Sequence, residues 1–348
     1  MNNRALIAMS GGVDSAIAAL LMQQNGFHCK GLTMRLTGQD GAGDALAVCH
    51  NLGMEHEVLD CRNDFNRQVI DRFVNTYLSG RTPNPCIDCN RLIKFGLLLD
   101  VARQQGFDTL VTGHYARLQI NENTGRVEIR KALDPGKDQS YVLYSLTQNQ
   151  LAHIAFPLGQ LTKQQVREMA RRQGLPVADR GESQDICFVP DGNYASFLEA
   201  YTGQPLTGGN FIDEKGAVVG QHRGIARYTL GQHRRLGLSA GHRVYVTNIN
   251  SVGNEVQVGP PEGLYHSALE ANGLSWISGN PPEDDARITA KTRYRSEQQP
   301  CTITLCGQDR MQVLFERPQR ALTPGQAVVL YNGDTMLGGG TIDRVLER

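Results

Sequence analysis

Two cysteines stand close together in the segment NPCIDCN, residues 84–90, with Pro83 and Pro85 beside them. A pair spaced like Cys86 and Cys89 can be half of a zinc site, a redox disulfide, a set of iron ligands, or a catalytic thiol with a neighbour. The spacing alone does not choose between these chemistries. The choice depends on what the rest of the chain provides.

A second candidate is the segment AMSGGVDSA, residues 8–16, which joins an apolar run to a helical pattern. Its two consecutive glycines let the backbone turn tightly and approach a ligand. The free N–H groups at a helix start favour an anion, and Ser10 and Ser15 add hydroxyl donors. Asp14 can hold a magnesium ion that bridges phosphates. A plain strand-to-helix turn, capped by Asp14 or Ser15, would use the same residue types.

The complete pattern Ser-Gly-Gly-Val-Asp-Ser, residues 10–15, is more specific than a pair of glycines. It lacks the Gly-Lys-Ser/Thr ending of a Walker loop, and it is not a Gly-x-Gly-x-x-Gly dinucleotide fingerprint. It resembles the PP-loop of the N-type ATP pyrophosphatases. Such enzymes cleave ATP to AMP and pyrophosphate and adenylate an oxygen of their second substrate.

The elements that must position these residues alternate up to about residue 115. Apolar runs predict strands at residues 5–9, 30–36, 55–61 and 109–113. Helical periodicity predicts helices from Val13 to Asn25, over 44–53, over 65–77 and over 92–102, with a loop at 79–90. This alternation indicates an α/β doubly wound parallel sheet, whose ligand lies at the carboxyl ends of the strands.

The pattern changes after about residue 190. Short alternating apolar segments separated by Gly and Pro turns indicate antiparallel strands, for example at residues 243–249, 254–258, 301–306, 311–315 and 327–331. We therefore expect three domains: a catalytic domain at 1–190, a small β-rich central domain at 191–264, and a C-terminal β-barrel at 265–348.

The composition of the 348-residue chain limits its class. Hydrophobic residues make up 40%, and we find no apolar run long enough to span a membrane and no signal peptide, so we expect a cytoplasmic protein without a membrane partner. Eight cysteines are too few for a disulfide scaffold. The formal net charge is +0, so a nucleic-acid partner would need a local basic patch.

Two acid-free basic runs lie in the β-rich half. Residues 216–254 contain five Arg and three His without Asp or Glu, and a second run contains Arg287, Lys291, Arg293 and Arg295. Read as one strand, residues 291–295 place their basic side chains on one face. A solvated basic surface is the simpler interpretation of either run alone. Both together favour a phosphate-binding surface, where Tyr228 or Tyr294 can stack on an unpaired base.

A set of longer motifs resembles the tRNA-specific 2-thiouridylase family. The motifs are GRTPNPCIDCNRLIKFG (80–96), TGHYAR (112–117), KDQSYVLY (137–144) and ESQDICFV (182–189), and the likeness continues at 224–238 and 291–296. With the PP-loop, it covers nearly the whole chain in order. The resemblance implies an enzyme that uses ATP with Mg²⁺ to replace oxygen by sulfur at C2 of the wobble uridine of tRNA, with release of AMP and pyrophosphate.

The same resemblance implies roles for individual residues. Cys89 is the catalytic nucleophile, and Cys187 carries a persulfide whose sulfur comes from a cysteine desulfurase or a sulfur-relay protein. Asn84, Pro85 and Cys86 line the target-base pocket. The ATP contacts are Ala8, Met9, Ser10, Gly11, Gly12, Val13, Asp14, Ser15, Met34 and Gly113. The tRNA contacts are His114, Lys137, Asp138, Gln139, Arg293, Tyr294 and Gln326.

Cys86 leaves alternatives open, because many relatives have Asp at this position and the role of that Asp does not transfer to a thiol. Cys86, Cys89 and Cys187 could hold a 4Fe–4S cluster with one open iron, or a zinc ion. A different PP-loop enzyme, such as an amide or C–N ligase, would explain residues 10–15 but not the thiols. A second departure is the short segment after Met34, where relatives carry a longer acidic insertion.

Overall fold

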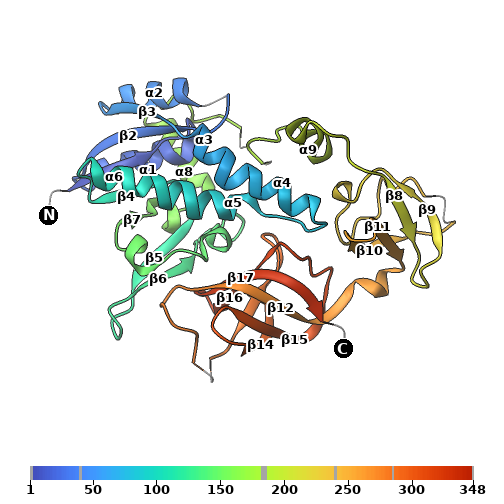
Figure 1. Cartoon of the computed structure of the whole chain (residues 1–348). Helices are drawn as coiled ribbons and strands as arrows, with labels where there is room; N and C mark the ends of the chain where they lie inside the picture. Colours follow the sequence, from blue (N-terminus) through green and yellow to red (C-terminus); the bar gives the residue numbers. More distant parts are fainter. Residues whose placement is uncertain (1–2, 39–40, 182–185, 239–240, 284–285, 347–348) are drawn as a thin grey trace.

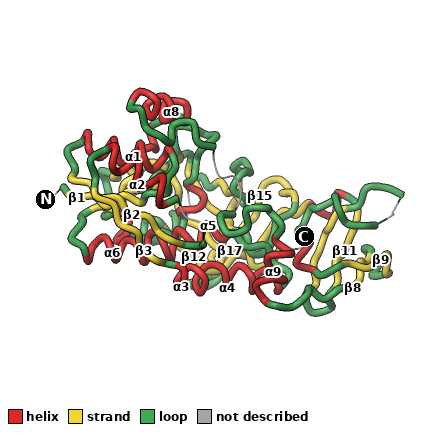
Figure 2. Tube along the Cα trace, turned by 90° about the horizontal axis from the view of Figure 1, so that it is seen from above, coloured by secondary structure: helices red, strands yellow, loops and turns green. Residues whose placement is uncertain are grey.

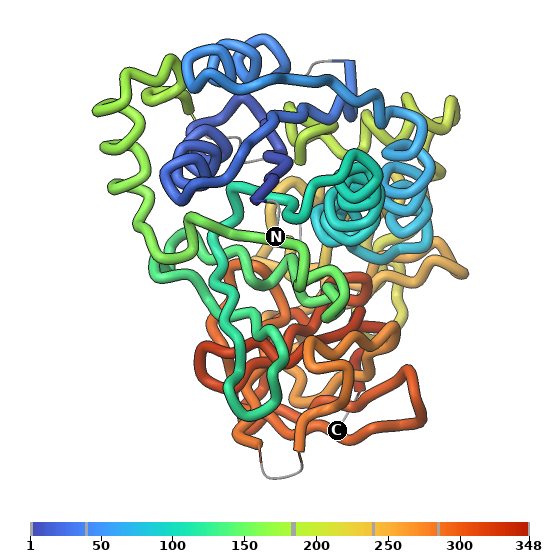
Figure 3. Tube along the Cα trace, turned by 90° about the vertical axis from the view of Figure 1, so that its left-hand side faces the viewer, coloured from blue at the N-terminus to red at the C-terminus, as the bar shows by residue number. Residues whose placement is uncertain are grey.

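The computed structural model describes residues 3–38, 41–181, 186–238, 241–283 and 286–346, whose strands form a five-stranded, a four-stranded and an eight-stranded sheet. Figure 1 shows the five-stranded sheet at the upper left, the eight-stranded sheet below it and the four-stranded sheet at the right. The perpendicular view in Figure 3 also places the red C-terminal strands below the blue N-terminal segment. The expected order of architectures is confirmed.

The first sheet has the strand order β3-β2-β1-β4-β7, and every pairing in it is parallel. Its strands are β1 (Arg4–Ala8), β2 (His28–Arg35), β3 (Glu55–Asp60), β4 (Thr109–Val111) and β7 (Ile154–Ala155). The chain moves outward on one side from β1 to β3 and then returns to place β4 on the other side of β1. The carboxyl ends of β1 and β4 therefore flank a topological switch point, where doubly wound sheets bind ligands.

Helices cover both faces of this sheet. Ala5 and Ile7 of β1 pack with α1 (Val13–Gln24), α2 (Ala42–Asn51) and α8 (Lys163–Arg172). Leu6 points the other way and packs with α6 (Leu98–Gln104). This alternation follows from the two-residue period of a strand, and it explains why β1 reads as a continuous apolar run.

The helical chain between β3 and β4 contains two π-helical stretches. It runs through α3 (Arg62–Phe65), η1 (Asn66–Ile70), α4 (Asp71–Leu78), α5 (Pro85–Asp88) and η2 (Cys89–Leu97) into α6. The predicted loop at 79–90 is thus too long, since the helix already starts at Pro85. Proline suits a first helical position, where no N–H partner is needed. Both cysteines of NPCIDCN lie on this helical segment.

The C-terminal strands close into a barrel. Their order is β12-β15-β14-β13-β16-β17, and β17 pairs back with β12. The bounds are β12 (Tyr265–Trp276), β13 (Thr289–Lys291), β14 (Gln299–Leu305), β15 (Arg310–Arg320), β16 (Ala327–Asn332) and β17 (Thr335–Leu346). The expected strand at 291–295 is wrong, because β13 ends at Lys291 and a turn follows, closed by Ser296 Oγ, which accepts from the backbone N–H of Arg293 at 3.2 Å.

The central part is a four-stranded sheet in the order β10-β11-β8-β9. It consists of β8 (Gly209–Ile212), β9 (Val218–His222), β10 (Tyr245–Asn250) and β11 (Glu255–Gly259), and α9 (Tyr194–Thr202) precedes it. In Figures 1 and 2 this sheet lies at the opposite end of the molecule from β1. The remaining short helices are η3 (Ser140–Leu143), α7 (Gln148–Leu151), η4 (Pro157–Gln160), η5 (Ile225–Arg227) and η6 (Pro261–Leu264).

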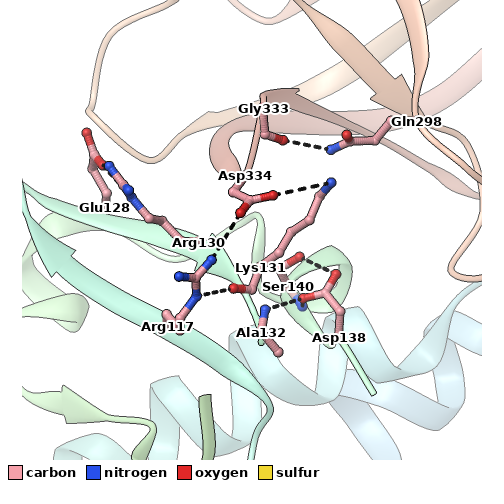
Figure 4. Close-up of polar contacts among 10 residues, drawn as sticks. All are labelled: Arg117, Glu128, Arg130, Lys131, Ala132, Asp138, Ser140, Gln298, Gly333 and Asp334. Carbon is pink, nitrogen blue, oxygen red and sulfur yellow. Dashed lines mark hydrogen bonds and ion pairs between the residues drawn. The ribbon is translucent and has the colours of Figure 1, made fainter. Parts of the chain in front are cut away.

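A hairpin from the N-terminal half extends the sheet of the barrel. Strands β5 (Ala116–Ile120) and β6 (Val127–Lys131) pair with each other, and Arg130 pairs with Thr335 of β17. Figure 4 shows the polar contacts at this joint, where Arg117 donates to Asp334 Oδ2 at 3.2 Å and Lys131 Nζ lies 4.0 Å from Asp334 Oδ1. This hairpin and the C-terminal barrel are thus held side by side. Within the described residues, no helix combines the length and apolarity that a membrane crossing requires.

Candidate active site

The loop between β1 and α1 has the geometry of an anion site. The hydroxyl of Ser15 donates to the carbonyl of Gly12 at 3.0 Å and accepts from the backbone N–H of Ser10 at 3.2 Å, which closes the loop. The N-cap residue Gly12 has no side chain with which to cap the first turn of α1. The N–H groups at the start of α1 are therefore not capped by that residue and favour an anionic ligand.

Two glycines make this loop fit its neighbours. Gly11 has φ +70°, and a Cβ there would lie 2.6 Å from the carbonyl oxygen of Gly41 at the start of α2. A Cβ on Gly113, just after β4, would lie 2.9 Å from the backbone of Asp14. Side chains at these positions would push the elements apart. The predicted ATP contacts at 8–15, Met34 near the end of β2, and Gly113 all lie at the carboxyl edge of the sheet, and their contact with ATP stays a prediction.

Lys163 reaches into the same loop, and sequence reasoning missed it. Its Nζ lies 2.7 Å from both carboxylate oxygens of Asp14, and the hydroxyl of Tyr115 donates to Asp14 Oδ1 at 2.7 Å. A capping box of Thr162 and Gln165 starts α8 at Lys163. That Thr-x-x-Gln pattern was a readable helix-start signal, but it carries no sign of where the side chain points.

Arg180 connects the nucleotide loop to the chain that leads to Cys187. Its guanidinium donates to the carbonyl of Gly11 at 2.9 Å and also contacts the carboxylate of Asp44 in α2. Residues 182–185 of the motif ESQDICFV lie outside the described residues. The chain is described again from Ile186, so only the second half of the motif, residues 186–189, is placed.

Aromatic side chains hold the Cys187 segment against the helix that carries Cys89. The ring of Phe188 lies edge-on to Phe65 at 5.7 Å and to Phe73 at 5.0 Å between centroids. Ile186 and Cys89 pack against the same apolar cluster, to which Met34 of β2 also belongs. The structure therefore brings two thiols that are far apart in sequence to one region, beside the end of β2.

All three thiols in this region are disfavoured as thiolates. Burial raises the pKa of Cys89 to about 12, while the Lys94 ammonium opposes this shift and Cys187 and Cys86 add to it. The pKa values of Cys86 and Cys187 are also raised by the surrounding protein, although their side chains are exposed. These mutual effects place the three sulfurs within electrostatic range of one another.

Lys94 is the cation that acts on this group of thiols. It lowers the pKa of Cys86, Cys89 and Cys187 against the effect of burial. It stands five positions after Cys89 in η2, whose end is closed by a bond from the Leu98 N–H to the Ile93 carbonyl. In an i→i+5 helix, residues five apart lie about one turn above one another. The π-helix thus places the ammonium on the face that carries Cys89.

The barrel fixes the loop that carries the predicted base pocket. The side-chain amide of Gln326 donates to the carbonyls of Thr82 and Pro83, both at 3.0 Å, and the N–H of Thr82 donates to the carbonyl of Pro324 at 2.9 Å. Arg81 forms an ion pair with Asp343 of β17 at 2.8 Å. Asn84, Pro85 and Cys86 follow directly, so their position depends on the C-terminal domain.

The predicted tRNA contacts in the N-terminal half differ in their surroundings. His114 is only 7% exposed and packs between Phe95 and Phe156, and burial lowers its pKa well below the usual value. Asp138 accepts from the N–H groups of Ala132 and Ser140 (Figure 4). Gln139 is likewise bonded to the backbone of Tyr115, whereas Lys137 is half-buried. The side chain of His114 is thus buried, and those of Asp138 and Gln139 are bonded to the backbone. These three residues fix the local backbone conformation where tRNA contacts are predicted.

The two tyrosines proposed as stacking surfaces are unlike. Tyr228 is 7% exposed, lies edge-on to Phe211 at 5.1 Å and packs in the core of the central sheet, so most of its ring is covered by the protein. Tyr294 is 37% exposed, and Cys86 is one of the groups that raise its pKa, after burial and Asp138. Arg293 is held by the carbonyl of Ala321 and by Thr323 Oγ1 at 3.2 Å. Tyr294 is therefore the better-placed aromatic surface.

A basic cavity of about 710 Å³ lies where α4 and α9 meet the central sheet. Its lining includes Arg223 and Arg235 of the first basic run, and Arg227, which pairs with Glu199 at 2.7 Å. Arg235 has φ +60°, an uncommon conformation for a residue other than glycine. The cavity gathers three arginines of the first basic run and none of the second, and phosphate binding there stays a prediction. Among the described residues, no three His, Cys, Asp or Glu side chains are grouped to bind one metal ion.

The parallel sheet, the SGGVDS loop at its switch point and the β-rich continuation define a PP-loop nucleotide-binding enzyme. Family models match along the chain: a tRNA methyl transferase HUP domain at residues 3–191, a tRNA methyl transferase PRC-barrel domain at 195–260, and an aminomethyltransferase beta-barrel domain at 266–342. The tRNA-specific 2-thiouridylase MnmA of Desulforamulus reducens is 45% identical over 100% of this chain and 99% of its own length. That of Carboxydothermus hydrogenoformans is 44% identical over 99% of this chain and 98% of its own length. The chain belongs to the tRNA-specific 2-thiouridylase family.

A solved structure aligns much more weakly. The U34-tRNA thiolase NcsA from Methanococcus maripaludis, described with its 4Fe–4S cluster, has a TM-score of 0.35 at 18% identity, over 57% of this chain and 66% of that chain. A likeness of this size supports no statement about activity or about a cluster in this chain.

Proposed function

We propose that this protein is an ATP-dependent tRNA-uridine 2-sulfurtransferase that thiolates the wobble uridine, U34. The observation that carries the proposal is the position of the Cys89 and Cys187 segments, which share one apolar cluster with Met34 beside the nucleotide loop. In this proposal the adenylating site and the sulfur-transferring site are adjacent. An amide or C–N ligase would have no use for the second of them.

In the first step the C2 oxygen of uridine attacks the α-phosphorus of ATP, and pyrophosphate leaves with the electron pair of the broken P–O bond. The proposed ATP contacts are residues 8–15, Met34 and Gly113. Mg²⁺ bound to the phosphates would neutralise part of their charge. Asp14 is poorly placed to bind that ion, because both of its carboxylate oxygens lie 2.7 Å from the Lys163 ammonium.

In the second step the terminal sulfur of a Cys187 persulfide attacks C2 and expels AMP. The Cys89 thiolate then attacks the sulfur of Cys187, which releases 2-thiouridine and leaves a Cys89–Cys187 disulfide. A cellular dithiol must reduce this disulfide before the next turnover. The high pKa of Cys89, about 12, means that bound tRNA or a proton acceptor must favour its thiolate at this moment.

Substrate recognition falls to the loop at 84–86 and to the basic surface. Asn84, Pro85 and Cys86 would line the pocket of the flipped uridine, with Tyr294 as the neighbouring stacking surface. Arg223 and Arg235 of the basic cavity would contact tRNA phosphates. The sulfur donor would be a cysteine desulfurase or a sulfur-relay protein that reaches the exposed Cys187.

A second candidate keeps the same product but uses a 4Fe–4S cluster on Cys86, Cys89 and Cys187. The position of Cys86 and Cys89 on one helical segment, with the Cys187 segment packed against it, favours this candidate, but within the described residues the three thiols are not grouped around one metal position. Anaerobic purification followed by iron and sulfide analysis separates the two. Metal-free protein that thiolates tRNA from a persulfide donor would exclude the cluster.

The proposed function is tested by incubating the protein with ATP, unmodified tRNA and a persulfide donor and then analysing the digested tRNA for 2-thiouridine. We expect 2-thiouridine and AMP in equal amounts. Pyrophosphate release without tRNA and without 2-thiouridine would instead support a ligase.

A further inference from the structure

A buried lysine stands inside the nucleotide loop. Lys163 is 8% exposed as a residue, and its side chain is 10% exposed against 34% for the side chain of Asp14. A charged ammonium at such a position is unfavourable unless strong partners compensate it. Two of its partners are Asp14 of the loop, both of whose oxygens lie 2.7 Å from Nζ, and Tyr115, whose ring centroid lies 5.8 Å from Nζ.

The backbone of Lys163 is fixed independently of this ion pair. The capping box of Thr162 and Gln165 starts α8, and the N–H of Lys163 donates to Asp134 Oδ2 at 3.0 Å. The side chain therefore projects toward the loop from a rigid helix start. A lysine needed only for solubility or helix propensity would point to solvent, since its ammonium is costly to bury.

The ion pair lies at the end of the helix where the anion is expected. Asp14 is the second residue of α1, and Ser15, next to it, closes the loop through Ser10 and Gly12. A carboxylate offers about four acceptor positions, and Asp14 already accepts from Lys163 on both oxygens and from Tyr115 on one. Asp14 thus serves to hold a cation supplied by the chain more readily than to bind a metal ion.

We propose that Lys163 is a catalytic residue of the adenylation step, which contacts the ATP phosphates while Asp14 and Tyr115 position it. This inference rests on the proposed function. As uridine O2 bonds to the α-phosphorus and the bond to the pyrophosphate oxygen breaks, negative charge accumulates on the departing pyrophosphate. The Lys163 ammonium stabilises this charge by donating a hydrogen bond, and it remains protonated throughout.

The test compares Lys163→Met with Lys30→Met. Lys30 also forms a partly buried ion pair, with Glu57 Oε2 at 2.6 Å, but it lies in the first half of β2, away from the loop. The readout is tRNA-dependent AMP release at saturating ATP. Loss of one preorganised donor typically costs about 10²–10³ in rate. We expect a loss of this size in kcat for Lys163→Met, partial activity for Lys163→Arg, and a nearly unchanged rate for Lys30→Met.

The double variant Asp14→Asn/Lys163→Met keeps the test decisive if Lys163→Met is unstable, because it leaves no unpaired buried charge. A purely structural ion pair predicts that the double variant folds and releases AMP at the rate of Asp14→Asn alone. Our proposal predicts that it folds and is slower than Asp14→Asn. AMP release by Lys163→Met at the wild-type rate, or by the double variant at the rate of Asp14→Asn, would overturn the inference.

A measurement without tRNA separates this inference from the proposed function. We expect titration calorimetry with magnesium pyrophosphate to show binding at least about tenfold weaker for Lys163→Met than for Lys30→Met, since the variant loses a hydrogen bond between two charged groups. Equal affinities would overturn the role of Lys163 even if the wild-type protein thiolates tRNA. Weaker binding would support it even if the wild-type protein forms no 2-thiouridine. Persulfide loading of Cys187, which needs no ATP, should be the same in all variants.

Discussion

The nucleotide loop and the thiol site are built in different ways. Residues 10–15 are contiguous, and short-range bonds such as Ser15 Oγ to the carbonyl of Gly12 at 3.0 Å set their conformation. The thiol site unites Cys89 on a π-helix with Cys187, held through the ring of Phe188 between Phe65 and Phe73. The first site is a local conformation, and the second exists only when distant segments pack together. Substitutions should therefore disturb the nucleotide loop through its backbone conformation and the thiol site through the packing between its segments.

The largest effect is expected from Cys187→Ser, which removes the proposed persulfide carrier. We expect 2-thiouridine formation to be abolished, while a single turnover of tRNA adenylation continues because the nucleotide loop is untouched. Mass spectrometry of digested tRNA and an AMP assay measure the two steps. Cys306→Ser, at a half-exposed thiol of the barrel, is the control. Retained thiolation in Cys187→Ser would refute the assigned role.

Gly11→Ala should disable the loop itself. A Cβ at φ +70° is strained and would lie 2.6 Å from the carbonyl oxygen of Gly41. A displacement of about 1 Å at a reacting group can cost about 10²-fold, so we expect at least this loss in tRNA-dependent AMP release. Gly43→Ala, at a position without neighbours within 4 Å, should leave the rate unchanged. A normal rate for Gly11→Ala would show that the loop is not under this constraint.

Phe188→Ala should weaken the packing that unites the thiol site. Truncation of a buried Phe costs about 3–5 kcal/mol of stability, and here it should also release the Cys187 segment and slow thiolation more than adenylation. Phe107→Ala is matched, because Phe107 is 5% exposed and belongs to another core cluster. Thermal unfolding and the two product assays separate the effects. Equal thiolation in the two variants would show that the aromatic cluster does not position Cys187.

Lys94→Met should raise the pKa of Cys89 above its value of about 12, since Lys94 opposes the effect of burial. Below the pKa the thiolate fraction grows about tenfold per pH unit, so iodoacetamide labelling of Cys89 should rise steadily from pH 7 to pH 10. We expect severalfold slower labelling in Lys94→Met at every pH, measured by peptide mass spectrometry. A plateau near pH 8 would contradict the raised pKa of Cys89. Lys30→Met is the control.

The smallest effect is expected from Gln326→Ala, which removes two hydrogen bonds from the barrel to the 79–84 loop. Each bond contributes about 0.5–1.5 kcal/mol, so a few-fold lower kcat for thiolation is expected with little change in folding. Gln298→Ala, which loses an exposed bond to the carbonyl of Gly333 at 3.3 Å, should have no effect. Identical kinetics in both variants would mean that the two Gln326 bonds do not position the base pocket.

Sequence patterns predicted the regular elements near the N-terminus well. The order of strands and helices up to β4 and the β-rich second half are confirmed, because period-two and helical apolar patterns are local properties. The helix start at Pro85 and the turn after Lys291 were missed. The composition around Pro85, rich in cysteine, resembles that of a loop. The alternation of basic residues that starts at Lys291 continues beyond the end of strand β13.

By itself, the sequence determined the fold class and the family, and it predicted the reactive residues, since motifs and periodicity are properties of short contiguous segments. Only the tertiary structure decided which distant groups share a site. It inserted Lys163 beside Asp14, buried His114 and Tyr228, and fastened the 79–84 loop to the barrel through Gln326. These contacts join residues many positions apart, and their existence depends on how whole layers pack, which no local pattern encodes.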